Sequence, residues 1–277
     1  TGWMMSEKLD GMRAYWSGSC FYSRAGKVVN APDWFVAGFP DTPLDGELWC
    51  GRGQFQKCMS IVRKHQPGPE WERVMFLVFD APKHQVNGKP AKYEERLAYI
   101  ESAVKPTKTK YARAVGVRRC SGEEDLLKYL KLVEAEDGEG LMLRMPGSTY
   151  DWKRSDTLLK VKTFCDEEAK VVAHEKGKGK NSDVMGHLVC ETPDGREFSV
   201  GSGFTDAQRQ NPPNIGAVIT YRYQELSNAL IPRFPTYVDT CDDLDWEKYC
   251  EEYDPPKLKK PSALNQSHTI LFTDTSA

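Results

Sequence analysis

The chain has 277 residues, of which 39% are hydrophobic and 28% are charged, and its formal net charge at pH 7 is −2. These values are ordinary for a soluble globular protein that is long enough for two domains, each with its own core. The sequence has no run of about 18 apolar residues, which excludes a membrane-spanning helix. Its eight cysteines form no C-x-x-C pair and it lacks H-E-x-x-H, so we expect neither a zinc site nor a dense disulfide framework.

The first segment of chemical interest is S-E-K-L-D-G-M-R, residues 6–13, in which Lys8 is followed by D-G-x-R. A lysine amine has an ordinary pKa of about 10.4, so it attacks a phosphorus atom only where neighbouring groups disfavour its charge. On an extended segment Lys8 and Asp10 share a face. A tight turn at Gly11 then brings Arg13 toward a bound phosphate. The same residues also fit an ordinary surface strand that enters a D-G turn, and the motif by itself leaves both interpretations open.

Two apolar segments follow, and both carry acidic residues. Residues 42–49, T-P-L-D-G-E-L-W, predict a strand with Asp45 and Glu47 on either side of a glycine. Residues 74–82, V-M-F-L-V-F-D-A-P, predict a buried strand that ends in Phe79 and an acid. From the pattern alone, Phe79 is interpreted as core packing and Glu47 as a solvated carboxylate, so their place in a site depends on the other segments.

The next segments combine a helix start with further charged strands. S-G-E-E, residues 121–124, predicts a capping box that opens a helix, and E-G-L-M-L-R begins at Glu139. Residues 158–162 have the sequence L-L-K-V-K. Alternation places Lys160 and Lys162 on one face of this strand and leucine and valine on the opposite face, which is expected to be buried. Two ammonium groups that face one cavity bind phosphate and lower the pKa of a third lysine.

From Asp166 onward the pattern changes to short alternating strands, with a turn at P-D-G. Strands are predicted at residues 168–174, 184–191, 196–201 and 217–224, and a helix near residues 205–210. This is the pattern of an all-β module of OB size. Between the first two strands lies the glycine-rich basic segment E-K-G-K-G-K-N-S, residues 175–182, which lacks P-loop spacing. It is interpreted either as a hairpin that contacts backbone phosphate or as a solvated loop.

The composition divides the chain into three regions. Residues 1–164 mix strands with helices, and residues 165–250 form the all-β module. Residues 251–277, with their prolines, lysines and small polar residues, are expected to be a flexible tail. The chain begins close to Lys8, so we expect any targeting segment to be absent from it and leave the localisation open. A protein of net charge −2 binds nucleic acid only if its basic residues segregate locally.

Together and in this order, the segments around Lys8, Glu47, Phe79, Glu139 and Lys160 resemble the motifs of the ATP-dependent DNA ligases, which are covalent nucleotidyltransferases. In particular they resemble the minimal, periplasmic-type bacterial ligases, which have a catalytic domain and an OB-fold domain. The resemblance extends from residue 2 to residue 239 and includes G-S-G-F-T-D-A-Q-R and P-R-F-P. It implies an α+β protein, in which a nucleotidyltransferase (ATP-grasp-like) domain of antiparallel sheets and helices precedes an OB-fold β-barrel.

The resemblance implies an enzyme that seals nicks in double-stranded DNA, as a monomer without a membrane partner, in repair, replication or recombination. Lys8 would take AMP from ATP as a phosphoramidate and release pyrophosphate. The AMP would then pass to the 5′-phosphate of the nick, and the adjacent 3′-hydroxyl would displace it. Such transfers are catalysed mainly by positioning and by stabilising charge on the phosphorus oxygens, for which lysines, arginines and a divalent metal suffice.

By the same resemblance, individual residues take roles at the ATP site. Besides Lys8, the ATP-binding residues would be Ser6 at the adenine edge, Phe79 stacked on the base, Arg13 and Glu47 at the ribose, and Lys160 and Lys162 at the α-phosphate.

The resemblance also assigns residues to metal and to DNA. Glu139 and Asp10 would bind Mg²⁺ or Mn²⁺, with Asp45 near the metal or the 3′-hydroxyl. Arg24 would hold the 5′-phosphate of the nick, and Arg154 is either a phosphate ligand or surface charge. The DNA-binding hairpin would use Lys176, Lys178 and Lys180.

One segment departs from the family pattern. After P-R-F-P, residues 232–235, the family places an arginine that orients the leaving pyrophosphate, whereas residues 237–244, Y-V-D-T-C-D-D-L, contain no basic residue. Arg233 and Lys248 are candidates to replace it. We therefore expect slow reaction with free ATP, while the pre-adenylylated protein still seals DNA.

Two alternative functions remain open at this point. The first is a related nucleotidyltransferase that acts on RNA, either an RNA ligase or a capping enzyme that uses GTP. The D-G-x-R segment together with the OB-fold motifs favours DNA. The second is a catalytically weakened nucleic-acid-binding relative, which the altered segment after P-R-F-P keeps open.

Overall fold

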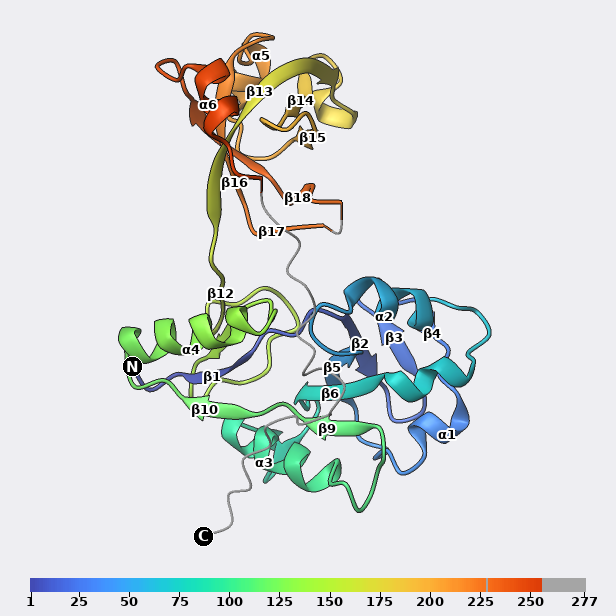
Figure 1. Cartoon of the computed structure of the whole chain (residues 1–277). Coiled ribbons are helices and arrows are strands. Elements are labelled where there is room, and N and C mark those ends of the chain that lie inside the picture. The colour runs from blue at the N-terminus through green and yellow to red at the C-terminus, as the bar shows by residue number, and fades with distance from the viewer. Residues whose placement is uncertain (228, 256–277) are drawn as a thin grey trace. The chain divides into compact units, whose positions relative to one another are not determined.

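The computed structural model describes residues 1–227 and 229–255, apart from the side chain of Lys180 (Figure 1). The described residues form two compact units, one of Thr1–Lys162 and a second that begins at Thr163. Both contain antiparallel sheets and short helices, which is the α+β class expected from the sequence. Among these residues, none of the helices is both long and apolar enough to cross a membrane.

The larger sheet of the first unit has the strand order β4-β3-β2-β5-β6-β9, and every pairing is antiparallel except that of β6 with β9. The strands are β2 (Met12–Trp16), β3 (Phe21–Ser23), β4 (Val28–Val29), β5 (Leu44–Trp49), β6 (Met75–Asp80) and β9 (Ala112–Ala114). The strands predicted at residues 42–49 and 74–82 are confirmed as β5 and β6, with slightly shorter bounds.

Close packing inside this sheet explains the glycine of the D-G-E segment in β5. A Cβ atom at Gly46 would lie 2.6 Å from the carbonyl oxygen of Leu77, which no real Cβ atom tolerates. Asp45 and Glu47, on either side of this glycine, share one face of the strand. Asp45 is buried and Glu47 is partly buried, so Glu47 is not the freely solvated carboxylate that the pattern alone suggested.

The main core of the first unit lies between this sheet and the helices beside it. These are α1 (Asp33–Val36), α2 (Phe55–Val62), the 3-10 helix η1 (Pro69–Arg73) and α3 (Tyr93–Ala103), with the ribbon of β7 (Gln85–Val86) and β8 (Lys89–Pro90) before α3. The core is rich in aromatic side chains, and Phe35 packs edge to face on Trp71 with ring centroids 4.8 Å apart. Burial of such apolar surface is the main stabilising contribution to the unit.

The second sheet of the first unit is antiparallel and has the order β10-β1-β11-β12. Its strands are β1 (Met4–Glu7), β10 (Val117–Arg119), β11 (Leu141–Arg144) and β12 (Leu158–Val161). Helix α4 (Glu123–Ala135) packs on this sheet through its apolar face, and these elements lie together in Figure 1. Because Lys8 follows β1 and Glu139 lies just before β11, the pairing of these two strands brings both residues to one end of the sheet.

The start of α4 differs from the prediction. The capping box expected at residues 121–124 is not formed, because the N-cap residue is Gly122 and no side chain caps it. Instead Asp125, in the first turn, accepts a hydrogen bond of 3.0 Å from the backbone N–H of Ser121. Asp125 therefore satisfies a backbone donor that precedes the helix, and the helix starts one residue later than predicted.

The second unit is built on a five-stranded antiparallel sheet with the order β15-β14-β13-β16-β19. Its strands are β13 (Cys165–Lys176), β14 (Met185–Glu191), β15 (Glu197–Val200), β16 (Val218–Tyr223) and β19 (Thr236–Thr240), and the first four confirm the predicted strands. The two edges of the sheet meet where Ser202 pairs in parallel with Thr236, so the sheet curls into a barrel.

The second unit also contains several short helices and strands outside this sheet. They are the 3-10 helix η2 (Gly179–Asn181), α5 (Asp206–Gln210), β17 (Glu225–Leu226), β18 (Pro232–Arg233) and α6 (Trp246–Glu252). Helix α5 confirms the helix expected near residues 205–210, and Thr205 and Gln208 form a capping box at its start. The last turn of α6 contains Glu251 and Glu252, the first residues of the predicted tail. From residue 256 onward, this tail lies outside the described residues.

Candidate active site

The side chain of Lys8 contacts Glu139 at the end of the smaller sheet. Lys8 Nζ donates a hydrogen bond to one carboxylate oxygen of Glu139, and Lys162 Nζ donates to the other. The backbone N–H of Lys8 also donates to the carbonyl oxygen of Gly140, at 2.8 Å. The structure therefore brings together three predicted site residues from separate segments, with one carboxylate between two ammonium groups.

Glu47 belongs to the other sheet and interacts electrostatically with this group. Its pKa is raised to about 8, mainly because the carboxyl group is removed from water. The positive charges of Lys8 and Arg13 oppose this rise, whereas the negative charges of Glu139 and Asp45 add to it. Glu47 thus lies between the Lys8–Glu139 pair and a second polar group that contains Arg13 and Asp45.

In this second polar group, Arg13 donates from Nε and Nη2 to the two carboxylate oxygens of Asp45, at 3.1 and 2.6 Å. The hydroxyl of Tyr150 donates to the same carboxylate at 2.7 Å. The guanidinium carbon of Arg13 lies 5.8 Å from the ring centroid of Phe79, so one face of this ring meets a cation. Phe79 is only partly buried, so it is not the buried core residue that the pattern alone suggested, and Tyr150 is a neighbour of Arg13 and Asp45 that the sequence did not predict.

A buried ion-pair network holds the end of β6 next to Phe79. Asp80 is fully buried and accepts hydrogen bonds from Arg96 of α3, at 2.5 Å, and from Arg144 of β11, at 2.9 Å. Tyr93 packs against both guanidinium groups, 5.6 and 5.2 Å from its ring centroid. Because β6 and β11 belong to different sheets, this network joins the two sheets beside the site.

The remaining residues predicted at the ATP and metal sites lie around this centre. Ser6 is in β1, in register with Met142, and Asp10 lies in the loop before β2; both are partly buried. Arg154 is exposed in the loop before β12.

The strand that carries Lys160 is only partly as predicted. Lys160 is exposed, whereas the side chain of Lys162, just beyond the strand, is 10% exposed. On the other face, Val161 packs on the core, but Leu159 is 43% exposed, so the prediction of a buried leucine is wrong. The physical reason is that β12 is the edge strand of its sheet, where no neighbour covers Leu159.

The metal prediction concerns Glu139 and Asp10. Among the described residues, no group of three or more His, Cys, Asp or Glu side chains is arranged to hold a metal ion. In nucleotide sites, however, Mg²⁺ is bound by one or two carboxylates together with substrate phosphates. Glu139 is an oxygen donor of this kind in contact with Lys8, and Asp10 follows two residues after Lys8 in the loop before β2. This donor set is chemically compatible with Mg²⁺ that arrives with ATP.

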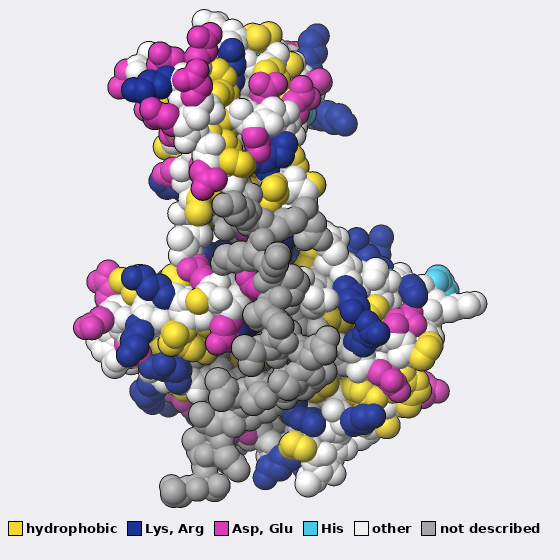
Figure 2. All heavy atoms as spheres, in the orientation of Figure 1, with side chains coloured by type: hydrophobic (Ala, Val, Ile, Leu, Met, Phe, Trp, Pro, Cys, Tyr) yellow, Lys and Arg dark blue, Asp and Glu magenta, His cyan; other side chains and the backbone are white. Residues whose placement is uncertain are grey.

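The residues predicted to bind DNA lie on the surfaces of the two units. Arg24 is exposed in the turn between β3 and β4, which is closed by a 2.9 Å hydrogen bond from the N–H of Gly26 to the carbonyl of Ser23. On the face drawn in Figure 2, Lys and Arg side chains are interspersed with Asp and Glu in both units. Basic side chains therefore do not dominate either unit on the face seen in this view.

In the second unit, Lys176 and Lys178 line a pocket of about 380 Å³, while the side chain of Lys180 lies outside the described atoms. The rest of the lining consists of Asn181, His187, Arg209 and three glycines, Gly177, Gly186 and Gly201. Arg209 is fixed by hydrogen bonds of 2.8 Å to the carbonyl oxygens of Gly186 and Gly201. The lysine and arginine side chains of this pocket attract anions.

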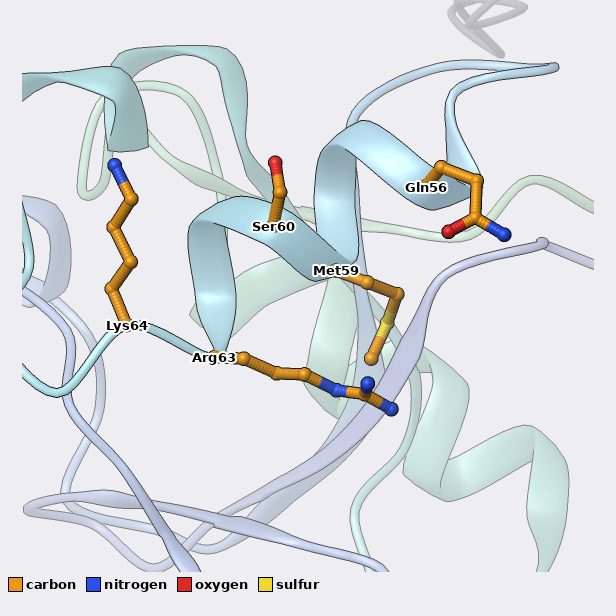
Figure 3. Close-up of a pocket in the computed structure, with 5 residues that line it drawn as sticks. All are labelled: Gln56, Met59, Ser60, Arg63 and Lys64. Carbon is orange, nitrogen blue, oxygen red and sulfur yellow. The ribbon is translucent and has the colours of Figure 1, made fainter.

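A hollow of similar size, about 380 Å³, lies on α2 and contains none of the predicted site residues (Figure 3). It is lined by Gln56, Met59, Ser60, Arg63 and Lys64. Figure 3 shows the Arg63 side chain extending toward Met59, whereas Lys64 points away. Lys64 pairs with Glu70 at 2.5 Å. We interpret this hollow as a surface groove on the helix.

Comparison with known proteins gives matches along both units. Residues 1–162 match the family model for the ATP dependent DNA ligase domain, and residues 176–240 match the model for the DNA ligase OB-like domain. The second unit is therefore the OB-like barrel that the sequence predicted. The order of the two domains is also that of the family to which the motifs pointed.

Individual relatives agree with the family models. A DNA ligase of Haemophilus influenzae is 41% identical over 236 residues, which cover 85% of this chain and 85% of that protein. A solved structure of a Lig E DNA ligase, described as binding DNA with a minimal scaffold, matches with a TM-score of 0.81 and 37% identity. That match covers 87% of this chain and 93% of the other. The RNA-directed and catalytically weakened alternatives are not favoured, and the chain belongs to the ATP-dependent DNA ligases, enzymes that join DNA with ATP.

Proposed function

We propose that this ligase seals nicks in duplex DNA by way of an adenylate carried on Lys8. The observation that supports the proposal most directly is the position of the Lys8 amine. It contacts Glu139, which also binds Lys162, and it interacts with Glu47 on the opposite sheet. An amine enclosed by lysines and acids from several segments is suited to bind and react with a phosphate, unlike an amine on an open surface.

The ion pairs around Glu139 indicate how the phosphate of ATP is received. The carboxylate occupies the anion position between Lys8 and Lys162, and a phosphate oxygen that takes its place meets the same two cations. The Lys8 ammonium then loses a proton to water, and its neutral nitrogen attacks the α-phosphorus. A P–N bond forms, the P–O bond to pyrophosphate breaks, and Lys162 and Lys160 stabilise the charge on the phosphorus oxygens.

The second polar group positions the nucleoside. Phe79 offers a ring face on which the adenine stacks, and Ser6 borders the base. Arg13 and Glu47 bind the ribose hydroxyls. The two hydrogen bonds from Arg13 to the carboxylate of Asp45 orient its guanidinium group. Glu139 and Asp10 would hold Mg²⁺, and the ion would supply positive charge to the phosphate oxygens.

DNA binding uses surfaces of both units. Arg24, in its exposed turn, holds the 5′-phosphate of the nick. In the second unit, a backbone phosphate enters the pocket lined by Lys176 and Lys178. AMP passes from Lys8 to the 5′-phosphate, and the 3′-hydroxyl then displaces it. We further propose that the enzyme acts as a monomer, which light scattering of the free protein tests.

The proposal is tested by incubating the protein with Mg²⁺ and α-labelled ATP, followed by nicked duplex DNA. We expect label that survives denaturation, disappears in Lys8→Ala and is released as the nick is sealed. Parallel reactions with GTP, and with an RNA strand at the nick, test the choice of nucleotide and substrate. Wild-type protein that acquires no denaturation-resistant label from ATP contradicts the proposal.

A further inference from the structure

Arg52 lies in the segment G-R-G after β5, in a backbone conformation that depends on both glycines. Gly51 has φ of 111° and Gly53 has φ of 66°, angles that residues with a side chain rarely adopt. The glycines turn the chain sharply on both sides of Arg52. Its side chain thereby leaves the larger sheet and reaches Glu7 on the smaller sheet.

The contact between Arg52 and Glu7 is a bidentate ion pair. Nε and Nη2 of Arg52 donate to the two carboxylate oxygens of Glu7, both at 2.8 Å. The two side chains are only 22% and 18% exposed. This pair raises the pKa of Arg52, so the guanidinium stays charged. Glu7 is the last residue of β1 and directly precedes Lys8. The bidentate ion pair with Arg52 therefore fixes the backbone from which the Lys8 side chain extends.

The same guanidinium also contacts the segment that carries Glu139. Arg52 Nη1 donates to the carboxylate of Glu136, the C-cap residue of α4, which lies in the turn that leads to β11. The Glu7 carboxylate lies against this turn as well, because a Cβ atom at Gly138 would be 3.2 Å from its Oε1. One side chain thus contacts the segments of both Lys8 and Glu139.

We propose that Arg52 is a positioning residue for the transfer of AMP to Lys8. This inference rests on the function proposed above. Arg52 links the end of β1 and the turn before β11 to the end of β5, the strand of Glu47. It keeps Lys8, Glu139 and Glu47 in their relative positions when ATP replaces the internal ion pair, and it does not touch the nucleotide itself.

The expected effect follows from the geometry of an attacking group. A misplacement of about 1 Å lowers the rate of a positioned reaction roughly 100-fold. Loss of Arg52 should therefore slow AMP attachment at saturating ATP by roughly 10- to 100-fold. The ATP concentration for half-maximal rate should change little, because Arg52 contacts no part of the nucleotide. Sealing of a nick that already carries AMP should be spared, since Lys8 does not attack in that step.

The experiment compares the full-length wild type with Arg52→Ala, Arg52→Lys, Glu7→Gln and the double variant Arg52→Ala/Glu7→Gln. Single-turnover labelling by α-labelled ATP gives the rate of AMP attachment, and pre-adenylylated nicked DNA gives the rate of the last step. Arg118→Ala is the matched control, because Arg118 forms an exposed ion pair with Asp125 in the same unit. We expect the control to stay within about twofold of wild type in both assays.

Each of the single variants Arg52→Ala and Glu7→Gln should slow AMP attachment. The double variant should be no slower than Arg52→Ala, because the two substitutions remove the same ion pair. Arg52→Lys should recover only part of the rate, since lysine keeps the charge without the fork. The inference is overturned if Arg52→Ala labels at the wild-type rate, if the two single effects add, or if lysine restores the full rate. An equal loss of sealing on pre-adenylylated DNA, in Arg52→Ala or in the milder Glu7→Gln, also overturns it. Failure of the wild type to label contradicts the proposed function instead.

Discussion

Replacement of Asp80 by alanine should destabilise the first unit by about 3–5 kcal/mol. Asp80 is fully buried and accepts hydrogen bonds from two guanidinium groups, of which that of Arg96 is itself only 1% exposed, and from the backbone N–H of Ala81 at 2.8 Å. Without the carboxylate, the charge of Arg96 stays buried with no counter-ion, and breaking buried pairs in this way costs about 3–5 kcal/mol. In a unit of this size, each kcal/mol lowers Tm by roughly 2–4 °C, so we expect a fall of roughly 6–20 °C.

Thermal melting of the full chain, followed by calorimetry and circular dichroism, measures this change. The transition of the second unit serves as an internal reference, because Asp80 lies in the first unit. Asp166→Ala is the matched control, since Asp166 pairs with Arg222 on the exposed surface and the pair is expected to contribute at most about 1 kcal/mol. Asp80→Asn keeps the side-chain volume and removes only the charge.

A loss of less than about 1 kcal/mol in Asp80→Ala would refute this reasoning, because it would equal the effect of a surface pair. The same conclusion would follow if Asp80→Asn were as stable as the wild type. In either case the two arginines would not depend on Asp80 for their charge balance, and the link between the sheets would have another source.

Three further predictions concern pH, DNA binding and reaction with free ATP. Burial raises the pKa of Tyr93 from 10.0 to about 12, so its un-ionised form stabilises the fold fully below pH 10 and this contribution is lost as the pH rises toward 12. Urea unfolding at about pH 9 and about pH 11 should show a loss that is smaller in Tyr93→Phe. Lys178→Ala removes one of the two lysine side chains that line the pocket in the second unit. In binding titrations it should weaken affinity for nicked DNA and reduce the salt dependence by about one phosphate contact, with AMP labelling unchanged. Cys241→Arg should accelerate AMP attachment from free ATP, and no gain in labelling rate would contradict the idea that this segment lacks a needed arginine.

The candidates to replace that arginine are already paired. Arg233 forms an ion pair with Glu225, in which Nη1 lies 2.8 Å from Oε1, and Lys248 lies 3.9 Å from Glu252 on the same helix. The Arg233–Glu225 pair is partly exposed and the Lys248–Glu252 pair is largely exposed, so each ion pair contributes little energy and leaves its basic side chain able to move. The effect of Cys241→Arg therefore measures how far either residue substitutes.

Local patterns were sufficient for several of the strands and for the order of the domains. Alternating or continuous apolar runs predicted β5, β6 and four strands of the barrel, because burial of one or both strand faces leaves a periodic signal in a few neighbouring residues. The motif around Lys8 and the acids of β5 were visible for a different reason. Their chemistry requires particular residue types at fixed short spacing.

The contacts that complete the site were not predictable in this way. Asp80 meets Arg96 and Arg144 across 16 and 64 residues of sequence, and Arg52 meets Glu7 across 45. No periodicity relates such partners, because the pairing is decided by which strands and turns become neighbours in the folded chain. The exposed Leu159 is a similar case, since its surroundings depend on the place of β12 at the edge of its sheet.

The two sheets of the first unit share no hydrogen-bonded strand pair among the described residues, and the proposed site lies at the seam between them. Ion pairs of Asp80 and of Arg52 connect the two sheets at separate points. Where charged side chains hold two sheets together, a single substitution can change the contact between the sheets. In one continuous sheet, a comparable change would require a shift in the register of the paired strands. Substitutions at these ion pairs are therefore expected to change how the two sheets are held beside the site, without altering the strand pairing of either sheet.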